Sequence, residues 1–475
     1  MDHRPLFLNG QWTSPGPALT VTNPATGETI GSVATIDAAG VRRAIDDAAA
    51  AWPAWRHLTG LERSRYLTRI ADAVEARADE MARMITLENG KPLPQAKGEM
   101  AMTVDHFRWF AEEARRIYGR VVPHQMPGKR HMVFQHPVGV VGAIAPWNFP
   151  VVLAARKIAP ALAAGCPVIL KPASATPLSS VLLAEAIEAA ELPAGVFQLV
   201  VGDAASIAET FFQHPDCRKV TFTGSTEVGR LLIRQAADHV TRLSLELGGH
   251  APLLVFADAE MDAAVEGAII AKFRNTGQSC IAANRVYVEQ SIYDEFVERL
   301  VERAGALTIG PGTEEGVDIG PLIDERALQH ALDQIEDARN RGAKIRCGGR
   351  RWDGAPGTFL EPTVITDLPE QASCLHFETF APVAPVIPFA DEAEGVARAN
   401  DTPYGLAAYV FTRDLARAWR LAEELEAGTI GINDATPATS QCPFGGMKES
   451  GLGRELGSEG IFAYLEPKHI SLGGM

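Results

Sequence analysis

The chain has 475 residues, more than a single hydrophobic core normally serves, so two or three domains are expected. Its formal net charge of −15 at pH 7 argues against a surface that binds nucleic acid or an anionic membrane. The sequence has neither an apolar N-terminal segment typical of a signal peptide nor an apolar run of membrane-spanning length, so we expect a cytoplasmic protein.

The N-terminal part is predicted to be helical. Long helices are expected over residues 36–88, and the amphipathic run 64–89 is followed by Gly90, a typical helix stop. A further helix is expected over residues 99–118, before Gly119.

Strands and helices alternate strictly from Val138 onward. Strand-like runs lie at 138–145, 167–171, 196–202, 219–224 and 243–247, with helical patterns between them. Such alternation predicts an α/β fold with a parallel sheet, which binds ligands beyond the carboxyl ends of its strands. The alternation resumes after Gly249 in a second α/β unit, which places a domain boundary near Gly248 and Gly249.

Polar residues gather where the strands of the first unit end. Asn148 follows the first strand, Lys171 ends the second, Ser225 follows the fourth and Glu246 lies in the fifth. All of them are therefore expected on one rim of one sheet. The run G224-S-T-E-V-G is a Gly-rich turn before a helix, which suits a phosphate but is also common in ordinary strand–helix turns; the G-x-G-x-x-G fingerprint is absent.

Each of these residues has a plain structural interpretation beside a functional one. Lys171 is either a solvated lysine or a donor to ribose hydroxyls. Asn148 is either a turn residue or an amide that stabilises an oxyanion, together with the backbone N–H of Cys280. Glu246, between two leucines, either faces solvent or lies in an apolar pocket, where burial raises its pKa and suits a general base.

Cys280 follows the polar segment F273-R-N-T-G-Q-S. The six cysteines stand singly, without a C-x-x-C pair or a Cys/His cluster, which argues against a disulfide framework or a metal site. A thiol with a carboxylate that can accept its proton is the minimum equipment for covalent catalysis on a carbonyl, and a thiolate forms more readily than an alkoxide near neutral pH.

A set of motifs extends over nearly the whole chain in one order, and it resembles the aldehyde dehydrogenase superfamily. The motifs are Pro146-Trp-Asn-Phe-Pro, K171-P, F222-T-G-S-T-E-V-G, L245-E-L-G-G, G277-Q-S-C, E378-T-F-A-P and F444-G-G-M-K-E-S-G-L-G-R. The resemblance implies NAD(P)-dependent oxidation of a small aldehyde to a carboxylic acid. It also implies a Rossmann-like cofactor domain (1–119 and 138–248), a catalytic domain (249–440) and an oligomerisation flap (120–137 and 455–475) of a homodimer or homotetramer.

The resemblance also implies the roles of individual residues. Cys280 is the nucleophile, Glu246 the general base and Asn148 the oxyanion donor. Lys171 and Glu378 hold ribose hydroxyls of the cofactor. The full cofactor set comprises Trp147, Asn148, Lys171, Pro172, Ser174, Gly224, Ser225, Leu247, Glu378 and Phe380, of which Phe380 packs near the nicotinamide and Ser225 contacts the pyrophosphate. Two departures are Ala381, where the family usually has Gly, and His250, which we interpret as structural.

Within the superfamily the chain is most similar to succinate-semialdehyde dehydrogenases. This resemblance implies that Arg156 and Arg274 hold the distal carboxylate of the substrate; the structural alternative for each is a surface arginine paired with an acid. Relatives also carry a Ser upstream of the residue at Cys442. Here Ala438 occupies that place, with Thr439 or Ser440 as substitutes, so a five-carbon substrate stays open.

Ser174 bears on the choice of cofactor. Relatives selective for NAD often carry Glu at this position, which repels a 2′-phosphate, so a neutral Ser174 predicts that NADP is accepted and preferred over NAD. Relatives also carry a second cysteine two residues after the nucleophile, whereas this chain has Ala282, which predicts no local redox switch.

Three alternative functions stay open. The first is a dehydrogenase for glutarate semialdehyde, 2-oxoglutarate semialdehyde or a betaine-type aldehyde. The second is a relative that transfers the acyl group to coenzyme A, against which Glu246 argues. The third is a catalytically silent protein with the same fold.

Overall fold

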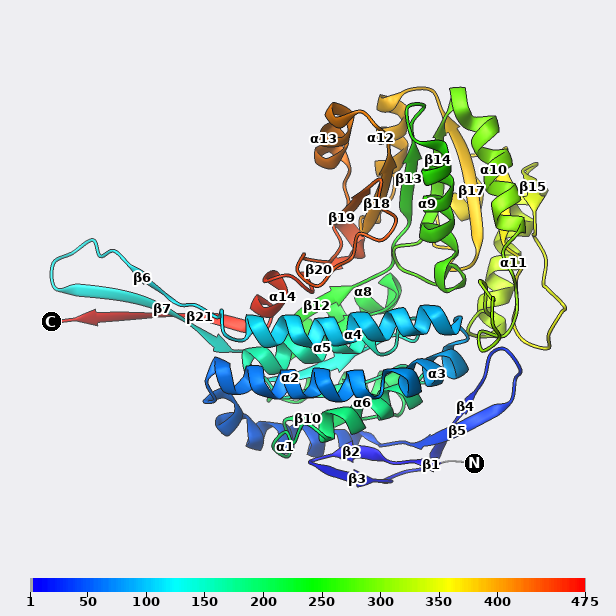
Figure 1. The fold of residues 1–475 in the computed structure, drawn as a ribbon. Coiled ribbons are helices and arrows are strands. Elements are labelled where there is room, and N and C mark those ends of the chain that lie inside the picture. The colour runs from blue at the N-terminus through cyan, green and yellow to red at the C-terminus, as the bar shows by residue number, and fades with distance from the viewer. Residues whose placement is uncertain (1–2, 475) are drawn as a thin grey trace.

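The computed structural model describes residues 3–474 and contains two large sheets, one in each half of the molecule (Figure 1). The six-stranded sheet has the order β10-β9-β8-β11-β12-β20 and the seven-stranded sheet the order β15-β16-β17-β14-β13-β18-β19. Both are mainly parallel, which confirms the predicted α/β class. Among residues 3–474, no helix has the length and apolar character to cross a membrane.

The six-stranded sheet contains the strands predicted after Val138. They are β8 (Val140–Ile144), β9 (Val168–Lys171), β10 (Phe197–Leu199), β11 (Cys217–Thr223), β12 (Arg242–Glu246) and the antiparallel β20 (Gly451–Leu452), with helices α5 (Val152–Ala164), α6 (Leu178–Glu188), α7 (Ala204–Gln213) and α8 (Thr226–Ala237). Every residue of β8, β9 and α5 is buried, as expected of a parallel sheet covered by helices.

Among the described residues up to Glu113, the chain forms four helices and five short strands. The helices are α1 (Ala38–Arg56), α2 (Gly60–Ala76), α3 (Ala78–Asn89) and α4 (Leu93–Glu113); the strands, which the sequence did not predict, are β1 (His3–Arg4), β2 (Leu6–Leu8), β3 (Gln11–Thr13), β4 (Ala18–Thr22) and β5 (Thr29–Ala34). The amphipathic run 64–89 divides at Arg77, whose φ of −112° and ψ of 10° lie outside the helical range. The helix expected from residue 99 begins at Leu93, because Pro94 favours its first turn.

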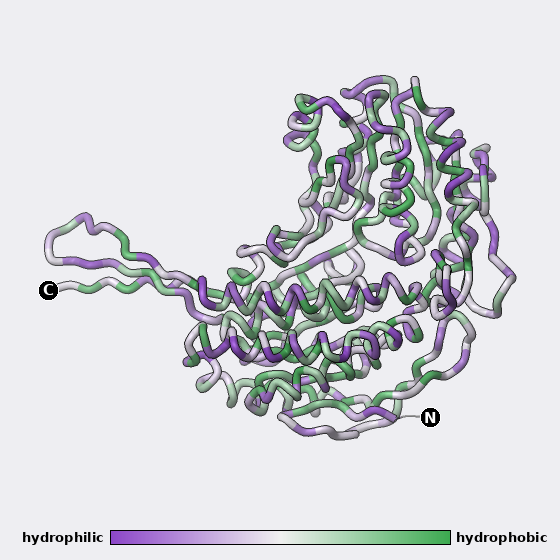
Figure 2. Tube along the Cα trace, viewed as in Figure 1, coloured by the Kyte–Doolittle hydropathy of each residue, from purple (hydrophilic) through white to green (hydrophobic). Residues whose placement is uncertain are grey.

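The chain passes to the seven-stranded sheet between Glu246 and Ala251. Its strands are β13 (Ala251–Val255), β14 (Ala283–Glu289), β15 (Lys344–Cys347), β16 (Thr363–Thr366), β17 (Val383–Phe389), β18 (Ala407–Phe411) and β19 (Thr429–Ile432), with helices α9 (Met261–Phe273), α10 (Tyr293–Gly305), α11 (Glu325–Asn340), α12 (Glu392–Asn400) and α13 (Leu415–Glu424). The strands appear largely apolar in Figure 2, whereas the helices alternate between apolar and polar residues.

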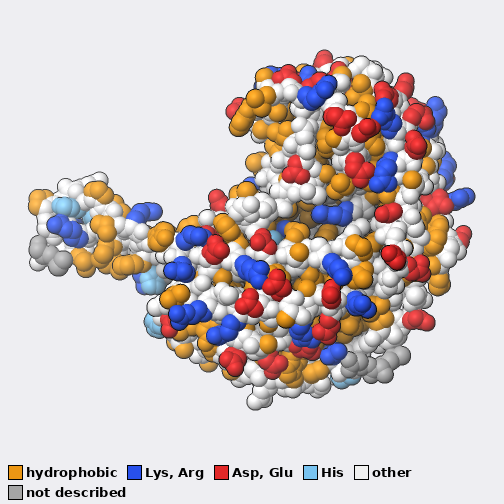
Figure 3. Space-filling view, viewed as in Figure 1, with side chains coloured by type: hydrophobic (Ala, Val, Ile, Leu, Met, Phe, Trp, Pro, Cys, Tyr) orange, Lys and Arg blue, Asp and Glu red, His pale blue; other side chains and the backbone are white. Residues whose placement is uncertain are grey.

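A third sheet projects from the rest of the molecule (Figure 1). It has the order β21-β7-β6 and consists of β6 (Arg120–Val122), β7 (Lys129–Pro137) and β21 (Leu465–Gly473), which follows the short helix α14 (Glu459–Phe462). Strand β21 pairs antiparallel with β7 along its whole length. In Figure 3 apolar side chains lie along this projection together with basic and histidine side chains, whereas acidic and basic side chains are interspersed over the rest of the drawn face.

Candidate active site

The carboxyl ends of four strands meet at one edge of the six-stranded sheet. Ile144 of β8 is in register with Lys171 of β9 and with Phe222 of β11, and Thr223 of β11 is in register with Glu246 of β12. The residues that follow these strands therefore lie on a common rim, as the sequence predicted. The rim faces the loop that leads into β14 and carries Cys280.

A cavity of about 240 Å³ lies at this rim, with the Cys280 thiol at its end. Seven residues of the predicted cofactor set line it: Trp147, Asn148, Gly224, Ser225, Leu247, Glu378 and Phe380. Lys171, Pro172 and Ser174 do not line it; Lys171 ends the adjacent strand and Ser174 is exposed in the loop after it. The residues of the predicted cofactor set therefore lie at one edge of the six-stranded sheet, where Ser174 is exposed to solvent.

Two charged side chains at this rim lack strong partners. The Glu378 carboxylate accepts one long hydrogen bond, 3.4 Å from the Gly249 N–H, and burial raises its pKa to about 8. The Lys171 ammonium has no hydrogen bond or ion pair with another residue in the described range, and burial lowers its pKa to about 8. Buried polar groups normally have partners, so this pair fits a ligand with hydroxyl groups, such as a dinucleotide ribose.

Ser225 begins helix α8 as its N-cap, and its hydroxyl accepts a hydrogen bond from the Val228 N–H at 3.3 Å. The helix N-terminus suits a phosphate group. Gly248 forms the facing wall, where a Cβ atom would lie 3.2 Å from Glu378 Oε2 and 3.2 Å from the Thr226 hydroxyl. These residues leave space for a dinucleotide and offer it the groups that the family resemblance implies.

Cys280 lies between this cavity and a second one, so its sulfur is accessible from both sides. Burial raises the pKa of the thiol to about 12; the Glu378 and Glu246 carboxylates raise it further, whereas Arg156 opposes them. The protein alone therefore keeps the thiol protonated. A base must take this proton.

The amide of Asn148 is fixed from several directions. Its Nδ2 donates to the Gln278 carbonyl at 3.1 Å. Its backbone carbonyl accepts from Lys91 Nζ at 2.7 Å and from Asn275 Nδ2 at 2.9 Å. Lys91 is in turn paired with buried Glu99 at 2.6 Å. One N–H of the Asn148 amide stays free at the cavity that contains Cys280, as an oxyanion donor requires.

Glu246 is 4% exposed and its Oε2 has no hydrogen-bond partner among the described residues. Burial raises the pKa of its carboxyl well above the ordinary value, and neighbouring Glu455 raises it further, against the effect of Lys157. The structure therefore favours the apolar-pocket interpretation over a solvent-facing strand residue. A carboxylate of this kind is a stronger base than an ordinary glutamate.

The second cavity has a volume of about 180 Å³ and contains the guanidinium groups of Arg156 and Arg274 together with Cys280. Arg156 lies over the Phe444 ring at 4.6 Å and Arg274 over the Phe149 ring at 5.8 Å. Neither arginine forms an ion pair with another residue of the described range. The remaining walls are mainly apolar: Met102, Val152, Leu153 and Ile281.

Thr439 does not reach this second cavity. Its hydroxyl donates to Gln441 Oε1 at 2.6 Å, and Ala438 lines the wall instead. The adjacent Ser440 is buried and bonded to His106 at 2.7 Å. The sequence left Thr439 and Ser440 as substitutes for the serine of relatives, and neither hydroxyl occupies that place.

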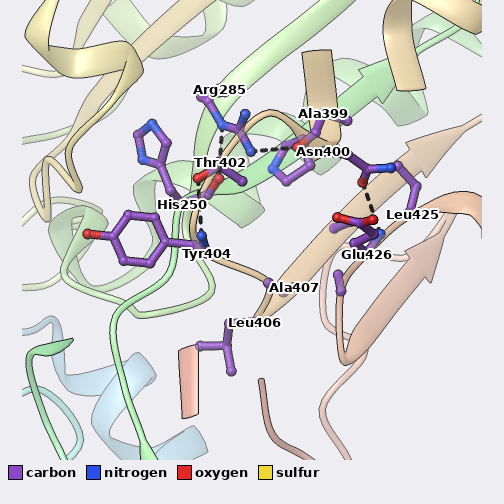
Figure 4. Close-up of a pocket in the computed structure, with 14 residues that line it drawn as sticks. His250, Arg285, Ala399, Asn400, Thr402, Tyr404, Leu406, Ala407, Leu425 and Glu426 are labelled. Carbon is purple, nitrogen blue, oxygen red and sulfur yellow. Dashed lines mark hydrogen bonds between the residues drawn. The ribbon is translucent and has the colours of Figure 1, made fainter. Parts of the chain in front are cut away.

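A third hollow, shown in Figure 4, lies behind Gly249 among His250, Arg285 and Tyr404. Its volume of about 10 Å³ is that of one water molecule, too small for a substrate. Arg285 donates to the carbonyls of Arg398 and Ala399, which ties β14 to the end of α12. The third hollow is therefore no candidate site, and the two cavities lined by Cys280 remain.

Comparisons with known proteins agree with this geometry. Residues 12–470 match the model of the Aldehyde dehydrogenase family. Glutarate-semialdehyde dehydrogenase of Pseudomonas aeruginosa is 50% identical, over 99% of this chain and 97% of the relative. The succinate-semialdehyde dehydrogenase (NADP⁺) of Escherichia coli is 48% identical, over 98% of this chain and 97% of the relative. The crystal structure of succinate-semialdehyde dehydrogenase from Burkholderia pseudomallei has a TM-score of 0.98 and 45% identity, covering 100% of this chain and 98% of that one.

Proposed function

The chain belongs to the aldehyde dehydrogenase family, and on that premise we propose that it oxidises succinate semialdehyde to succinate with NAD(P)⁺. The observation that supports this substrate is the pair Arg156 and Arg274, which have no carboxylate partner among the described residues and share a cavity with the Cys280 thiol. A four-carbon chain with an aldehyde at one end and a carboxylate at the other offers one group to the thiol and one to the arginines. Charge-assisted hydrogen bonds then hold the carboxylate end.

In the proposed reaction Glu246 takes the proton of the Cys280 thiol, and the sulfur adds to the aldehyde carbon. The Asn148 amide and the Cys280 N–H stabilise the negative charge that develops on the oxygen. Trp147 and Phe380, which line the rim cavity, would hold the nicotinamide of a bound cofactor, and that group would accept the hydride. Once Glu246 has released the first proton to solvent, it deprotonates a water molecule, which hydrolyses the thioester on Cys280 and releases the acid.

NADP is the proposed preferred cofactor. Ser174 is small, uncharged and exposed beside the strand end that carries Lys171, so a 2′-phosphate meets no acidic group from this position. We expect Ser174→Glu to shift the ratio of kcat/KM toward NAD. A preference of the unmodified enzyme for NAD of more than about tenfold, roughly 1.4 kcal/mol, would overturn the proposal.

Glutarate semialdehyde is the second candidate, because Ala438 leaves the wall of the arginine cavity without a hydroxyl group at this position. Initial rates on four- and five-carbon semialdehyde acids, beside butanal and pentanal, test both candidates. We expect both acids to exceed the neutral aldehyde of equal length. A neutral aldehyde as good as its acid would reject the arginine clamp and with it both candidates.

A further inference from the structure

Arg156 is held from behind by a buried chain of hydrogen bonds that starts at its Nε atom. The Arg156 Nε–H donates to His106 Nε2 at 3.3 Å, and His106 Nδ1 lies 2.7 Å from the Ser440 hydroxyl oxygen. The Ser440 hydroxyl donates in turn to Asp105 Oδ2. Asp105 and His106 belong to α4, Arg156 to α5, and Ser440 to the loop after β19.

The protons in this chain have a single consistent assignment. Arginine is only a donor, so His106 Nε2 must present its lone pair. The His106 proton then lies on Nδ1 and is donated to Ser440, whose own proton points to the Asp105 carboxylate. Burial and the charge of Arg156 hold the pKa of His106 well below its ordinary value, so the imidazole stays neutral.

The hydrogen-bond acceptor behind the buried Arg156 is His106 Nε2, which carries no charge. Buried charges are normally paired with an opposite charge. Here Arg156 is 4% exposed, and the nearest carboxylate of its chain, Asp105, is exposed and separated from it by an imidazole and a hydroxyl. The Nη1 and Nη2 atoms donate to no other described residue, and Arg156 lines the cavity that contains Cys280. The Glu455 and Glu246 carboxylates act on this charge without a hydrogen bond to it, so the charge is oriented but has no direct ion pair.

We propose that His106 is a positioning residue that fixes the Arg156 guanidinium for an anionic substrate while leaving its charge available, with Ser440 and Asp105 fixing the required His106 tautomer. The inference deepens the proposed function and rests on it, because the distal carboxylate is the group that Arg156 would receive. A glutamate in place of His106 would hold the arginine equally well but would neutralise it.

Three substitutions at His106 separate these effects, measured with succinate semialdehyde and with butanal as the neutral control of equal length. His106→Leu removes the acceptor, and we expect kcat/KM for the acid to fall by roughly tenfold, mainly through KM, with butanal within about twofold. His106→Gln keeps an acceptor and should restore most of the loss. His106→Glu should lower kcat/KM for the acid further, by on the order of 100-fold. Equal losses on both substrates, or none on either, would overturn the inference.

A double-mutant cycle distinguishes failure of this inference from failure of the proposed function. If His106 acts through Arg156, His106→Leu has no further effect on selectivity in an Arg156→Ala background. If Arg156→Ala itself leaves the preference for the acid unchanged, the clamp is wrong; if Arg156→Ala removes the preference but His106→Leu does not, only the present inference is wrong. If His106→Leu does not fold, Ser440→Ala is measured in its place. It should cause a several-fold loss on the acid alone, and an unchanged preference there would likewise contradict the inference.

Discussion

Burial favours the protonated forms of two groups that must react, the Cys280 thiol and the Glu246 carboxyl. Burial raises the pKa of Cys280 to about 12 and that of Glu246 well above its ordinary value. The same burial that disfavours the thiolate therefore strengthens the base that must generate it. Burial thus raises the pKa of the proton acceptor, Glu246, as well as that of the proton donor, Cys280.

Glu246 should determine the acidic limb of the pH profile. It works as a base only after losing its proton, so kcat/KM should rise with pH through a pKa above that of an ordinary glutamate. Glu246→Gln should have low, flat activity over that range.

The folded state also binds the Glu246 proton more tightly than the unfolded chain does. The contribution of this group to the free energy of unfolding therefore falls as pH rises through its raised pKa, and Glu246→Gln should lack that fall. A wild-type limb unchanged in Glu246→Gln would contradict this assignment.

Arg274→Ala should separate charge recognition from catalysis. A charge-assisted hydrogen bond contributes roughly 1.5–3 kcal/mol, so kcat/KM for succinate semialdehyde should fall about 10- to 150-fold. Butanal, which has no carboxylate, should lose little. Steady-state rates with both substrates check this, and equal losses would mean that Arg274 supports the fold of the site rather than the substrate.

The sequence identified the reacting residues but not what holds them. Cys280, Glu246, Asn148 and the two arginines stand in recognisable motifs. Lys91 and His106 act on them from positions about fifty residues away along the chain, at 2.7 Å and 3.3 Å. No local pattern marks such partners, because only packing of α4 against α5 brings them together.

At the scale of elements, the periodic helices and strands were predicted well and the irregular connections were not. Helix α9 ends at Phe273 in a short 3-10 turn, where Asn275 and Thr276 have φ of 53° and 57°, and no periodic pattern predicts such a turn. Left-handed backbone is common for Asn but costly for the β-branched Thr276, and surrounding contacts maintain it. Asn275 accordingly donates to the Gln278 carbonyl at 3.0 Å, which presents the loop carrying Cys280.

Gly249, in the crossing between the two sheets, should not tolerate a side chain. A Cβ atom there would lie 2.2 Å from the Cys280 carbonyl oxygen, so Gly249→Ala should displace the catalytic loop, lower activity at least tenfold and cost about 1–3 kcal/mol of stability. Gly305→Ala is the matched control, since Gly305 ends α10 and a Cβ atom there meets nothing within 4 Å. Thermal unfolding and kcat/KM check both. Equal behaviour of the two variants would contradict the steric argument.

At the scale of the whole molecule, the two sheets place the thiol between the rim cavity and an arginine-containing cavity. This two-sided access could not be predicted from the sequence, because the cavity walls come from α4, α5, the rim loops and the segment around Phe444. The α/β class could be predicted, because buried parallel strands have continuous apolar runs. The motif from Phe444 onward also has a structural role. Ser450 Oγ donates to the Gly248 carbonyl at 2.7 Å and accepts from the Gly405 N–H at 2.9 Å, which joins the two halves.

The projecting sheet should mediate self-association. Val121 and Phe134 are 75% and 43% exposed on it, and the outer edges of β6 and β21 have no neighbouring strand within the described chain. We expect a homo-oligomer in solution and a shift toward the monomer in the double variant Val121→Lys, Phe134→Lys, with secondary structure retained. Light scattering coupled to size-exclusion chromatography measures the mass. A monomeric wild type, or an unchanged mass in the variant, would contradict this expectation.

The most direct test of the account is to trap the acyl group on the proposed nucleophile. The unmodified enzyme is mixed with succinate semialdehyde and NADP⁺, acid-quenched within the first turnover and analysed by peptide mass spectrometry. The account predicts a succinyl adduct on the peptide that contains Cys280, formation of about one NADPH per active site, and neither signal in Cys280→Ala. An adduct on another residue, or undiminished turnover by Cys280→Ala, would contradict it.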